Sequence, residues 1–81
     1  MPSILLDVIE VTPRSGGTLF LVFENGERRI FDVKSLMGKK PFDRLADTRF
    51  FLSARVGYGT VVWGDDMDIA PETLYEKSSA A

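Results

Sequence analysis

Hydrophobic and polar residues alternate along the first third of the chain, as they do in β-strands. The alternation predicts one strand from Ile4 to Thr12, which Pro13 ends, and a second from Thr18 to Phe23. A turn over residues 13–17 separates them. Apolar side chains fall on both faces of the first strand, Leu6 and Val8 on one face and Ile9 and Val11 on the other.

The dipeptide Asn25-Gly26 is the strongest local signal of a turn. A two-residue type I′ turn needs positive φ at both central residues, which asparagine and glycine tolerate. A third strand, Arg28 to Asp32, is therefore expected to return antiparallel to the second. This turn predicts two cross-strand pairs on opposite faces, Leu21 with Ile30 and Phe20 with Phe31. We expect one apolar face to pack against helices and the other to meet loops, a second sheet layer or a partner chain.

Short helices are predicted in the middle of the chain. Residues 33–40 are expected to be irregular or a single helical turn, because a glycine and a proline bracket them. Pro41 suits the first position of a short helix that reaches about Ala46. Asp47 can then cap a further turn from Thr48 to Phe51, since its carboxylate can accept a hydrogen bond from a free amide.

The last third of the chain predicts a second hairpin and a final helix. Strands from Ser53 to Val56 and from Thr60 to Trp63 are joined through Gly57-Tyr58-Gly59. Pro71 is expected to begin a helix that ends near Lys77.

These elements predict a single α+β domain over residues 4–77, followed by a frayed tail over residues 78–81. The domain combines a small antiparallel sheet, built from two hairpins and a first strand, with short helices in the middle and at the C-terminus. A chain of 81 residues buries only about 60% of the surface it exposes when unfolded, so a large ligand cavity would remove much of its core. We therefore expect a protein that acts through its surface.

The sequence contains no cysteine and no histidine. Their absence excludes disulfides, thiolate nucleophiles, zinc–sulfur sites and Ser-His-Asp chemistry. We expect no enzymatic activity and no cofactor. The lack of disulfides favours the cytoplasm, and Asp7 interrupts the apolar N-terminal stretch too early for a signal peptide or a membrane span.

Charge is distributed unevenly along the chain. Residues 1–27 carry −3, residues 28–55 carry +5 and residues 56–81 carry −4. The basic middle could neutralise phosphates, which supports nucleic-acid binding as an alternative function. The residues concerned are Lys34, Lys39, Lys40 and Arg44, with Arg49 and Arg55 nearby in sequence. A solvated surface that faces the acidic tail explains the same residues, and an isoelectric point near 5.0 is low for a nucleic-acid-binding domain.

Carboxylates cluster in the run Gly64-Asp65-Asp66-Met67-Asp68, and such clusters can bind calcium or magnesium. The spacing does not fit an EF-hand loop, because Ala70 occupies the position that requires glycine. Solvated turn carboxylates explain this cluster better. Asp68 could instead accept hydrogen bonds from free amides of the final helix.

The run from Thr60 to Tyr75 combines a strand ending in tryptophan, an acidic turn, Asp68-Ile69, Pro71-Glu72 and Leu74-Tyr75. It resembles the bacterial domain-of-unknown-function family 2442. Upstream matches extend the likeness over nearly the whole chain, at Phe23 to Arg29, Phe31 to Val33, Pro41-Phe42, Leu45 and Asp47. The resemblance implies an α+β fold, no established enzyme activity and no assigned catalytic residues. Some relatives are similar to antitoxin-like partners encoded beside another small protein.

One position departs from the family pattern. Many relatives have proline directly after the tryptophan, where this chain has Gly64. The geometry of that turn is therefore expected to differ here.

The leading hypothesis is a non-catalytic protein-interaction module, an antitoxin-like or regulatory partner of another small protein encoded by an adjacent gene. Trp63 and Tyr75 are aromatic residues suited to interfaces, although a core position beneath Ile69 and Leu74 explains Trp63 better. The expected partner-binding residues are Phe20, Phe31, Tyr58 and Trp63 as apolar anchors, with Arg49 and Arg55 orienting the partner. A homodimer is a further expectation, because an exposed hairpin edge invites pairing.

Overall fold

The computed structural model describes residues 6–81 and confirms the α+β class. Two antiparallel sheets form, one with strand order β1-β2-β3-β7 and one with order β4-β5-β6. The strands are β1 (Val8–Arg14), β2 (Thr18–Phe23), β3 (Arg28–Asp32), β4 (Arg55–Gly57), β5 (Thr60–Trp63), β6 (Met67–Ile69) and β7 (Ser79–Ala80). The helices are η1 (Val33–Leu36), η2 (Phe42–Ala46), α1 (Thr48–Phe51) and α2 (Pro71–Glu76). None of the helices in residues 6–81 has the length and apolar character needed to cross a membrane.

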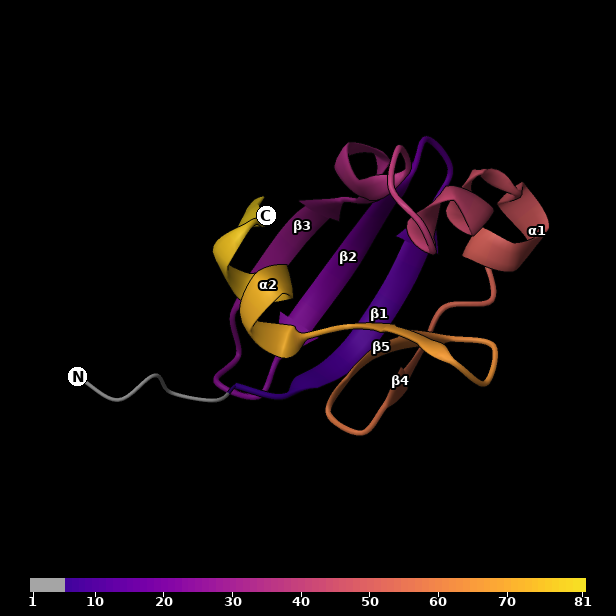
Figure 1. Ribbon diagram of the computed structural model, residues 1–81. Coiled ribbons are helices and arrows are strands. Elements are labelled where there is room, and N and C mark those ends of the chain that lie inside the picture. Colours follow the sequence, from indigo (N-terminus) through magenta and orange to yellow (C-terminus); the bar gives the residue numbers. More distant parts are fainter. Residues whose placement is uncertain (1–5) are drawn as a thin grey trace.

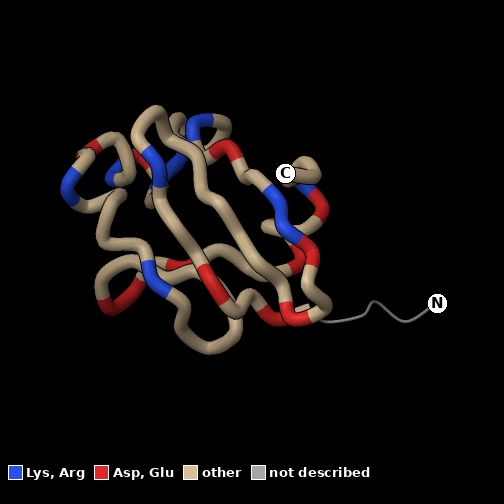
Figure 2. Tube along the Cα trace, turned by 180° about the vertical axis from the view of Figure 1, so that it is seen from behind, with Lys and Arg blue, Asp and Glu red and all other residues tan. Residues whose placement is uncertain are grey.

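α2 and β6 lie in front of the larger sheet, whereas α1 lies to its right, beside β1 (Figure 1). The hairpin of β4 and β5 lies beside β1, and the Val8 N–H donates to the Gly59 carbonyl at 2.9 Å. Seen from behind, β1, β2 and β3 form an open face with no described element in front of them (Figure 2). The larger sheet therefore has one covered face and one open face.

The core lies on the covered face, between the two sheets and the helices. The residues of β2 alternate in burial: Leu19, Leu21 and Phe23 are fully buried, and the residues between them are partly exposed. Trp63 is also fully buried, and its Nε1–H donates to the carbonyl of Phe51 at 3.0 Å, which ties β5 to α1. Alternation with a period of two is what a sheet with one buried face requires.

The first hairpin differs by one residue from the predicted register. Phe20 pairs with Ile30 and Leu19 pairs with Phe31, so the predicted pairs Leu21 with Ile30 and Phe20 with Phe31 are wrong. The loop has three residues instead of two, because Phe23 N–H bonds to Glu27 and only Gly26 takes a positive φ. This is a type I turn followed by a glycine bulge, a common hairpin loop. Asn25 keeps a negative φ and accepts the Glu27 N–H through its side chain.

The first strand also departs from prediction. The described part of β1 begins at Val8, runs through Pro13 to Arg14 and contains a β-bulge between Val8 and Glu10. Because the bulge adds a residue, Val8 and Val11 both lie on the covered face, opposite Phe23 and Leu21. The predicted assignment of Val8 and Val11 to opposite faces is therefore wrong. The predicted start of this strand and domain at Ile4 lies outside the described residues.

Several local predictions are confirmed. The Asp47 carboxylate accepts hydrogen bonds from the amides of Arg49 and Phe50 and begins α1. Pro71 occupies the first turn of α2. The second hairpin forms as predicted, although β4 begins at Arg55 instead of Ser53.

Two predictions near the C-terminus are wrong. Asp68 does not cap α2, because it lies in β6 opposite Val62, and Ala70 precedes the helix without a side-chain cap. Residues 79 and 80 do not fray but pair with the edge of β3. Arg29 fixes this segment, since its guanidinium donates to the hydroxyl and carbonyl oxygens of Ser78 at 2.6 and 2.9 Å.

Candidate functional site

Tyr58 lies at the tip of the β4–β5 hairpin and is fully exposed. It has a φ of 55°, and Gly59 has a φ of 76°. Two positive φ values define the type I′ turn, which glycine, asparagine and aspartate favour. A tyrosine in the left-handed region is uncommon and costs conformational energy. The Tyr58 side chain makes no hydrogen bond to any of residues 6–81, so no such bond offsets this conformational energy.

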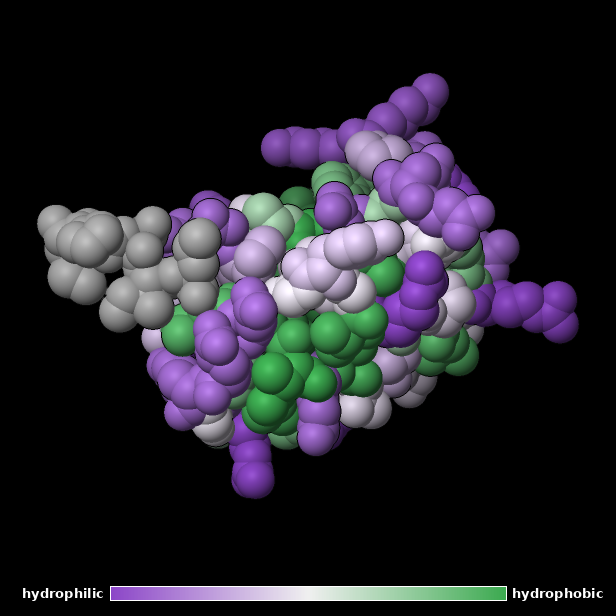
Figure 3. Space-filling model, turned by 90° about the horizontal axis from the view of Figure 1, so that it is seen from below, coloured by the Kyte–Doolittle hydropathy of each residue, from purple (hydrophilic) through white to green (hydrophobic). Residues whose placement is uncertain are grey.

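Three of the exposed large hydrophobic side chains come from the region where β1 meets the β4–β5 hairpin. Ile9 is 53% exposed, Val56 is 37% exposed and Tyr58 is 100% exposed. We call these three residues the hairpin ridge. In the view from below, where this end of the molecule faces the reader, hydrophobic surface gathers between polar side chains (Figure 3). Such a grouping is characteristic of contact surfaces in small soluble proteins.

A shallow depression of about 250 Å³ borders Tyr58 on the outer side of the smaller sheet. Its lining includes Val62 and the exposed carboxylates of Asp65, Asp66 and Asp68. Arg55 also lines it and donates to the carbonyl of Gly64 at 2.8 Å. Of the hairpin ridge, Tyr58 lines this hollow, which has more acidic than basic groups, whereas Ile9 and Val56 do not line it.

The predicted partner-binding residues do not form one surface. Phe31 and Trp63 are 1% and 0% exposed, so a partner cannot reach them unless the core opens, and their assignment as anchors is wrong. Both were candidates because aromatic residues suit interfaces and cores equally. Phe20 is partly exposed on the open face of the larger sheet.

The two predicted charged residues are also separated. Arg55 lines the depression beside Tyr58. Arg49 is exposed on α1 and does not line this depression. Only Tyr58 and Arg55 of the predicted set are therefore brought together.

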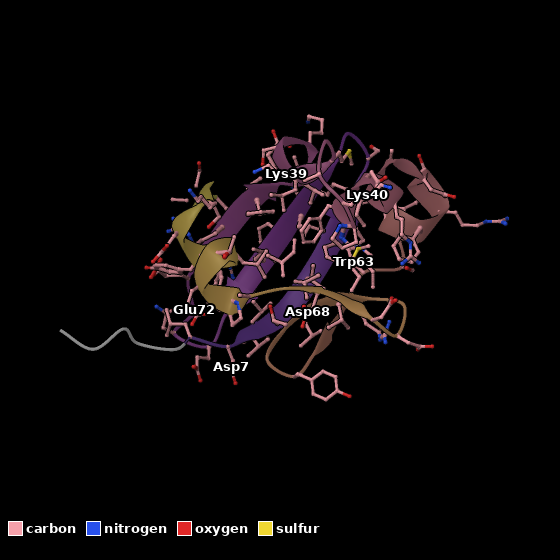
Figure 4. All side chains as sticks on the ribbon, in the orientation of Figure 1. Asp7, Lys39, Lys40, Trp63, Asp68 and Glu72 are labelled. Atoms are coloured by element: carbon pink, nitrogen blue, oxygen red, sulfur yellow. The ribbon has the colours of Figure 1, made fainter. Side chains whose placement is uncertain are left out.

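The residues proposed for nucleic-acid binding are partly occupied by contacts within the chain. Lys34 Nζ donates to the Gly16 carbonyl at 2.7 Å and lies 3.5 Å from Asp32. Arg44 lies 3.6 Å from Asp66 and stacks over the Phe50 ring. Lys39 and Lys40 are exposed at the end of the molecule opposite Asp7 and Glu72 (Figure 4). Nucleic-acid binding stays a prediction.

Tyr75, an aromatic residue considered for an interface, makes its contacts within the chain. Its hydroxyl donates to both carboxylate oxygens of Glu27, at 2.6 and 3.1 Å. This bond lowers the pKa of Glu27, with smaller contributions in the same direction from Asn25 and Arg29, and raises the pKa of Tyr75. The ring packs edge-on against Phe23, with centroids 5.3 Å apart, and the Arg29 guanidinium lies over it. The cluster attaches α2 to the sheet.

The acidic turn shows no metal-binding arrangement. Within residues 6–81, no group of three or more Asp, Glu, His or Cys side chains could hold a metal ion. Asp66 faces Arg44, and Asp68 is exposed on β6. Asp65, Asp66 and Asp68 are all exposed to solvent, but Asp68 lies on a strand and not in the turn.

The α+β fold, with a strand that ends in Trp63, agrees with what the resemblance implies. A family model described as "Protein of unknown function (DUF2442)" matches residues 8–80. The chain belongs to the DUF2442 family. Comparisons with curated proteins and with solved structures gave no match.

Gly64 explains how this DUF2442 member departs from the family pattern. Its φ of 60° is outside the range that the proline ring allows. A DUF2442 chain with proline at this position must therefore form the β5–β6 turn differently. In this chain the turn also presents the Gly64 carbonyl to Arg55.

Sequence reasoning missed two members of the hairpin ridge, Ile9 and Val56. The exposure of Ile9 accompanies the β-bulge, which the alternation pattern does not reveal. Val56 belongs to a strand that was correctly expected, but its exposure depends on where β4 meets β1. The sequence feature that pointed to the hairpin ridge was Tyr58, because a tyrosine beside glycine at a hairpin tip is exposed to solvent.

Proposed function

We propose that the protein is a non-catalytic interaction module that binds another small protein through the hairpin ridge. The partner is encoded by an adjacent gene, and the pair has an antitoxin-like or regulatory relationship in the cytoplasm. The observation that carries the proposal is Tyr58, a fully exposed aromatic residue held in a strained backbone conformation. Strain that packing within the chain does not offset is characteristic of functional positions.

The chemistry of the surface defines the kind of partner. Tyr58 and its apolar neighbours Ile9 and Val56 provide contact area at a small cost in side-chain entropy. The depression that Tyr58 lines exposes three carboxylates, and residues 56–81 carry a formal charge of −4. A basic protein with an apolar patch complements this surface in both charge and hydrophobicity. Arg55, the one basic group in the depression, would fix the orientation of the partner.

Co-expression with the adjacent gene product, followed by affinity capture and calorimetry, tests the proposal. We expect Tyr58→Asn to weaken binding by at least about thirtyfold, the effect of removing a central interface residue. Asparagine suits the turn, so the fold is retained. Leu52→Asn is the matched control, because Leu52 is 48% exposed but follows α1 and is not part of the ridge. The proposal fails if the wild-type proteins do not associate at micromolar concentrations, or if both variants bind equally well.

A further inference from the structure

The open face of the larger sheet presents an apolar centre made of residues from β2 and β3. Phe20, Val22 and Ile30 point to this face, because the strand register places them opposite to Leu19, Leu21, Phe23 and Phe31, which are buried on the other side. All three are partly exposed, and no described element packs over them (Figure 2). Apolar groups in the middle of an uncovered sheet need a partner surface or remain in contact with water.

Four charged side chains mark the corners of this face. The strand register places Glu10, Val22 and Arg28 in one cross-strand row, and Arg14, Thr18 and Asp32 in another. Glu10 and Arg14 lie on β1, whereas Arg28 and Asp32 lie on β3. All four are exposed. Going around the face, the sign of the charge therefore alternates from corner to corner.

Most of this charge is free to act on a partner. No salt bridge within residues 6–81 involves Glu10, Arg14 or Arg28. Arg14 lies over the Phe20 ring at 4.8 Å, which holds its charge at the edge of the apolar centre. Asp32 lies 3.5 Å from Lys34, so its corner is partly neutralised.

An alternating pattern of this kind is complementary to a copy of itself. When two such faces meet about a twofold axis parallel to the strands, Glu10 lies over Arg28 of the second copy and Arg14 lies over Asp32. When the axis runs across the strands, Glu10 lies over Arg14 and Arg28 lies over Asp32. In an orthogonal packing, by contrast, every corner meets a charge of its own sign. Sheets packed face to face commonly align within about 30°, which corresponds to the two attractive arrangements.

We infer that the open face binds a second copy of this chain in an aligned, face-to-face homodimer. Phe20, Val22 and Ile30 form the apolar centre of the interface, and the four corner charges set its orientation. An isologous interface of this kind uses the same patch on both subunits. Three short strands make a small interface, so the dimer forms and dissociates in a concentration-dependent equilibrium. The hairpin ridge of the proposed function is not needed for this contact.

Sedimentation equilibrium of the purified chain over a range of concentrations tests the inference. We expect a monomer–dimer equilibrium in the wild type. Val22→Lys should raise the dissociation constant at least about thirtyfold, because each dimer then buries two charges in an apolar centre. Leu52→Lys is the matched control and should leave the constant unchanged, since Leu52 lies at the end of α1. Circular dichroism establishes that both variants are folded.

Charge exchange determines the direction of the twofold axis. Glu10→Lys alone should weaken the dimer about tenfold, because each dimer acquires two like-charge contacts. Glu10→Lys/Arg28→Glu should restore affinity if the axis is parallel to the strands, and Glu10→Lys/Arg14→Glu should do so if it runs across them. The double variant that does not restore affinity should dimerise more weakly than Glu10→Lys alone, because it adds two further like-charge contacts to each dimer. Three outcomes would overturn the inference: a wild type that is monomeric at all concentrations, a Val22→Lys variant that dimerises like the wild type, or two double variants that both fail to restore affinity. Failure of the proposed function would leave these results unchanged.

Discussion

At the scale of single residues, Gly59 suits the positive φ of the β4–β5 turn, whereas Tyr58 does not. Gly59 is required, since a Cβ built there would lie 2.7 Å from a carboxylate oxygen of Asp7, and its φ is positive. Tyr58 also has a positive φ but is a residue that the turn disfavours. The side chain of Tyr58 therefore contributes to something other than the stability of the hairpin.

We expect Tyr58→Asn to raise the free energy of unfolding by about 1 kcal/mol, because asparagine enters the left-handed region more easily than tyrosine. Full exposure of Tyr58 means that no buried contact is lost. Urea denaturation followed by circular dichroism measures the change. A lower stability in the variant would show that the tyrosine ring supports the fold after all.

The hydrogen bond between Tyr75 and Glu27 makes stability depend on pH at both ends of the scale. The folded pKa of Glu27 is lowered, so its contribution is present above the pKa of an unfolded glutamate and is lost as the pH falls through the folded pKa. The folded pKa of Tyr75 is raised, so its contribution is present below the pKa of an unfolded tyrosine and is lost as the pH rises through the folded pKa. We expect Tyr75→Phe to lower the midpoint of thermal unfolding at neutral pH and to flatten both dependences. Thermal melts from pH 3 to 11, about the range of these titrations, provide the measurement. If the variant loses stability at low pH in the same way as the wild type, the hydrogen bond from Tyr75 to Glu27 is not the cause of that loss.

At the scale of elements, the sequence predicted the helix starts at Asp47 and Pro71 but not the register of the first hairpin. Asp47 and Pro71 could be assigned from the sequence because capping and proline preferences act on their immediate neighbours. Asn25-Gly26 is compatible with a two-residue and a three-residue loop, and only the packing of Leu19, Leu21 and Phe23 selects between them. The open face and its charge pattern could not be derived from the sequence for the same reason, since a shift of one residue reverses which side chains face outward.

The Asp47 cap should be measurable in the stability of the whole domain. We expect Asp47→Ala to lower the free energy of unfolding by about 1 kcal/mol, because two amides at the start of α1 lose their acceptor. Asp47→Asn should retain most of the stability, since the asparagine side-chain oxygen can accept the same bonds. Denaturant titration of the three proteins provides the comparison. Equal losses in both variants would indicate that the charge matters and the hydrogen bonds do not.

At the scale of the whole molecule, the two edges of the larger sheet differ in how they are covered. β7 covers the edge of β3, where the Ala81 N–H also donates to the Arg28 carbonyl at 3.0 Å. The β4–β5 hairpin lies beside β1 at the other edge. A paired edge does not recruit a strand from another chain, so β7 protects the β3 side of the sheet. The β1 side is held to the hairpin by the Val8–Gly59 hydrogen bond and has no paired strand.

Removal of residues 79–81 should expose the edge of β3. We expect the truncated protein to lose about 1 to 2 kcal/mol of stability through the missing hydrogen bonds, and to aggregate on warming. Differential scanning calorimetry with light scattering records both effects. A truncated protein as stable and soluble as the full chain would show that the β7 pairing is dispensable.

The contact between Arg29 and Ser78 joins segments 49 residues apart, and it also has a consequence for biosynthesis. During translation, the first three strands leave the ribosome well before the segment that closes their free edge. Long-range pairing of this kind slows folding, since a large loop must close before the contact forms. A nascent chain thus passes through a stage in which its longest sheet is still incomplete, and that interval is when chaperones would have access to it.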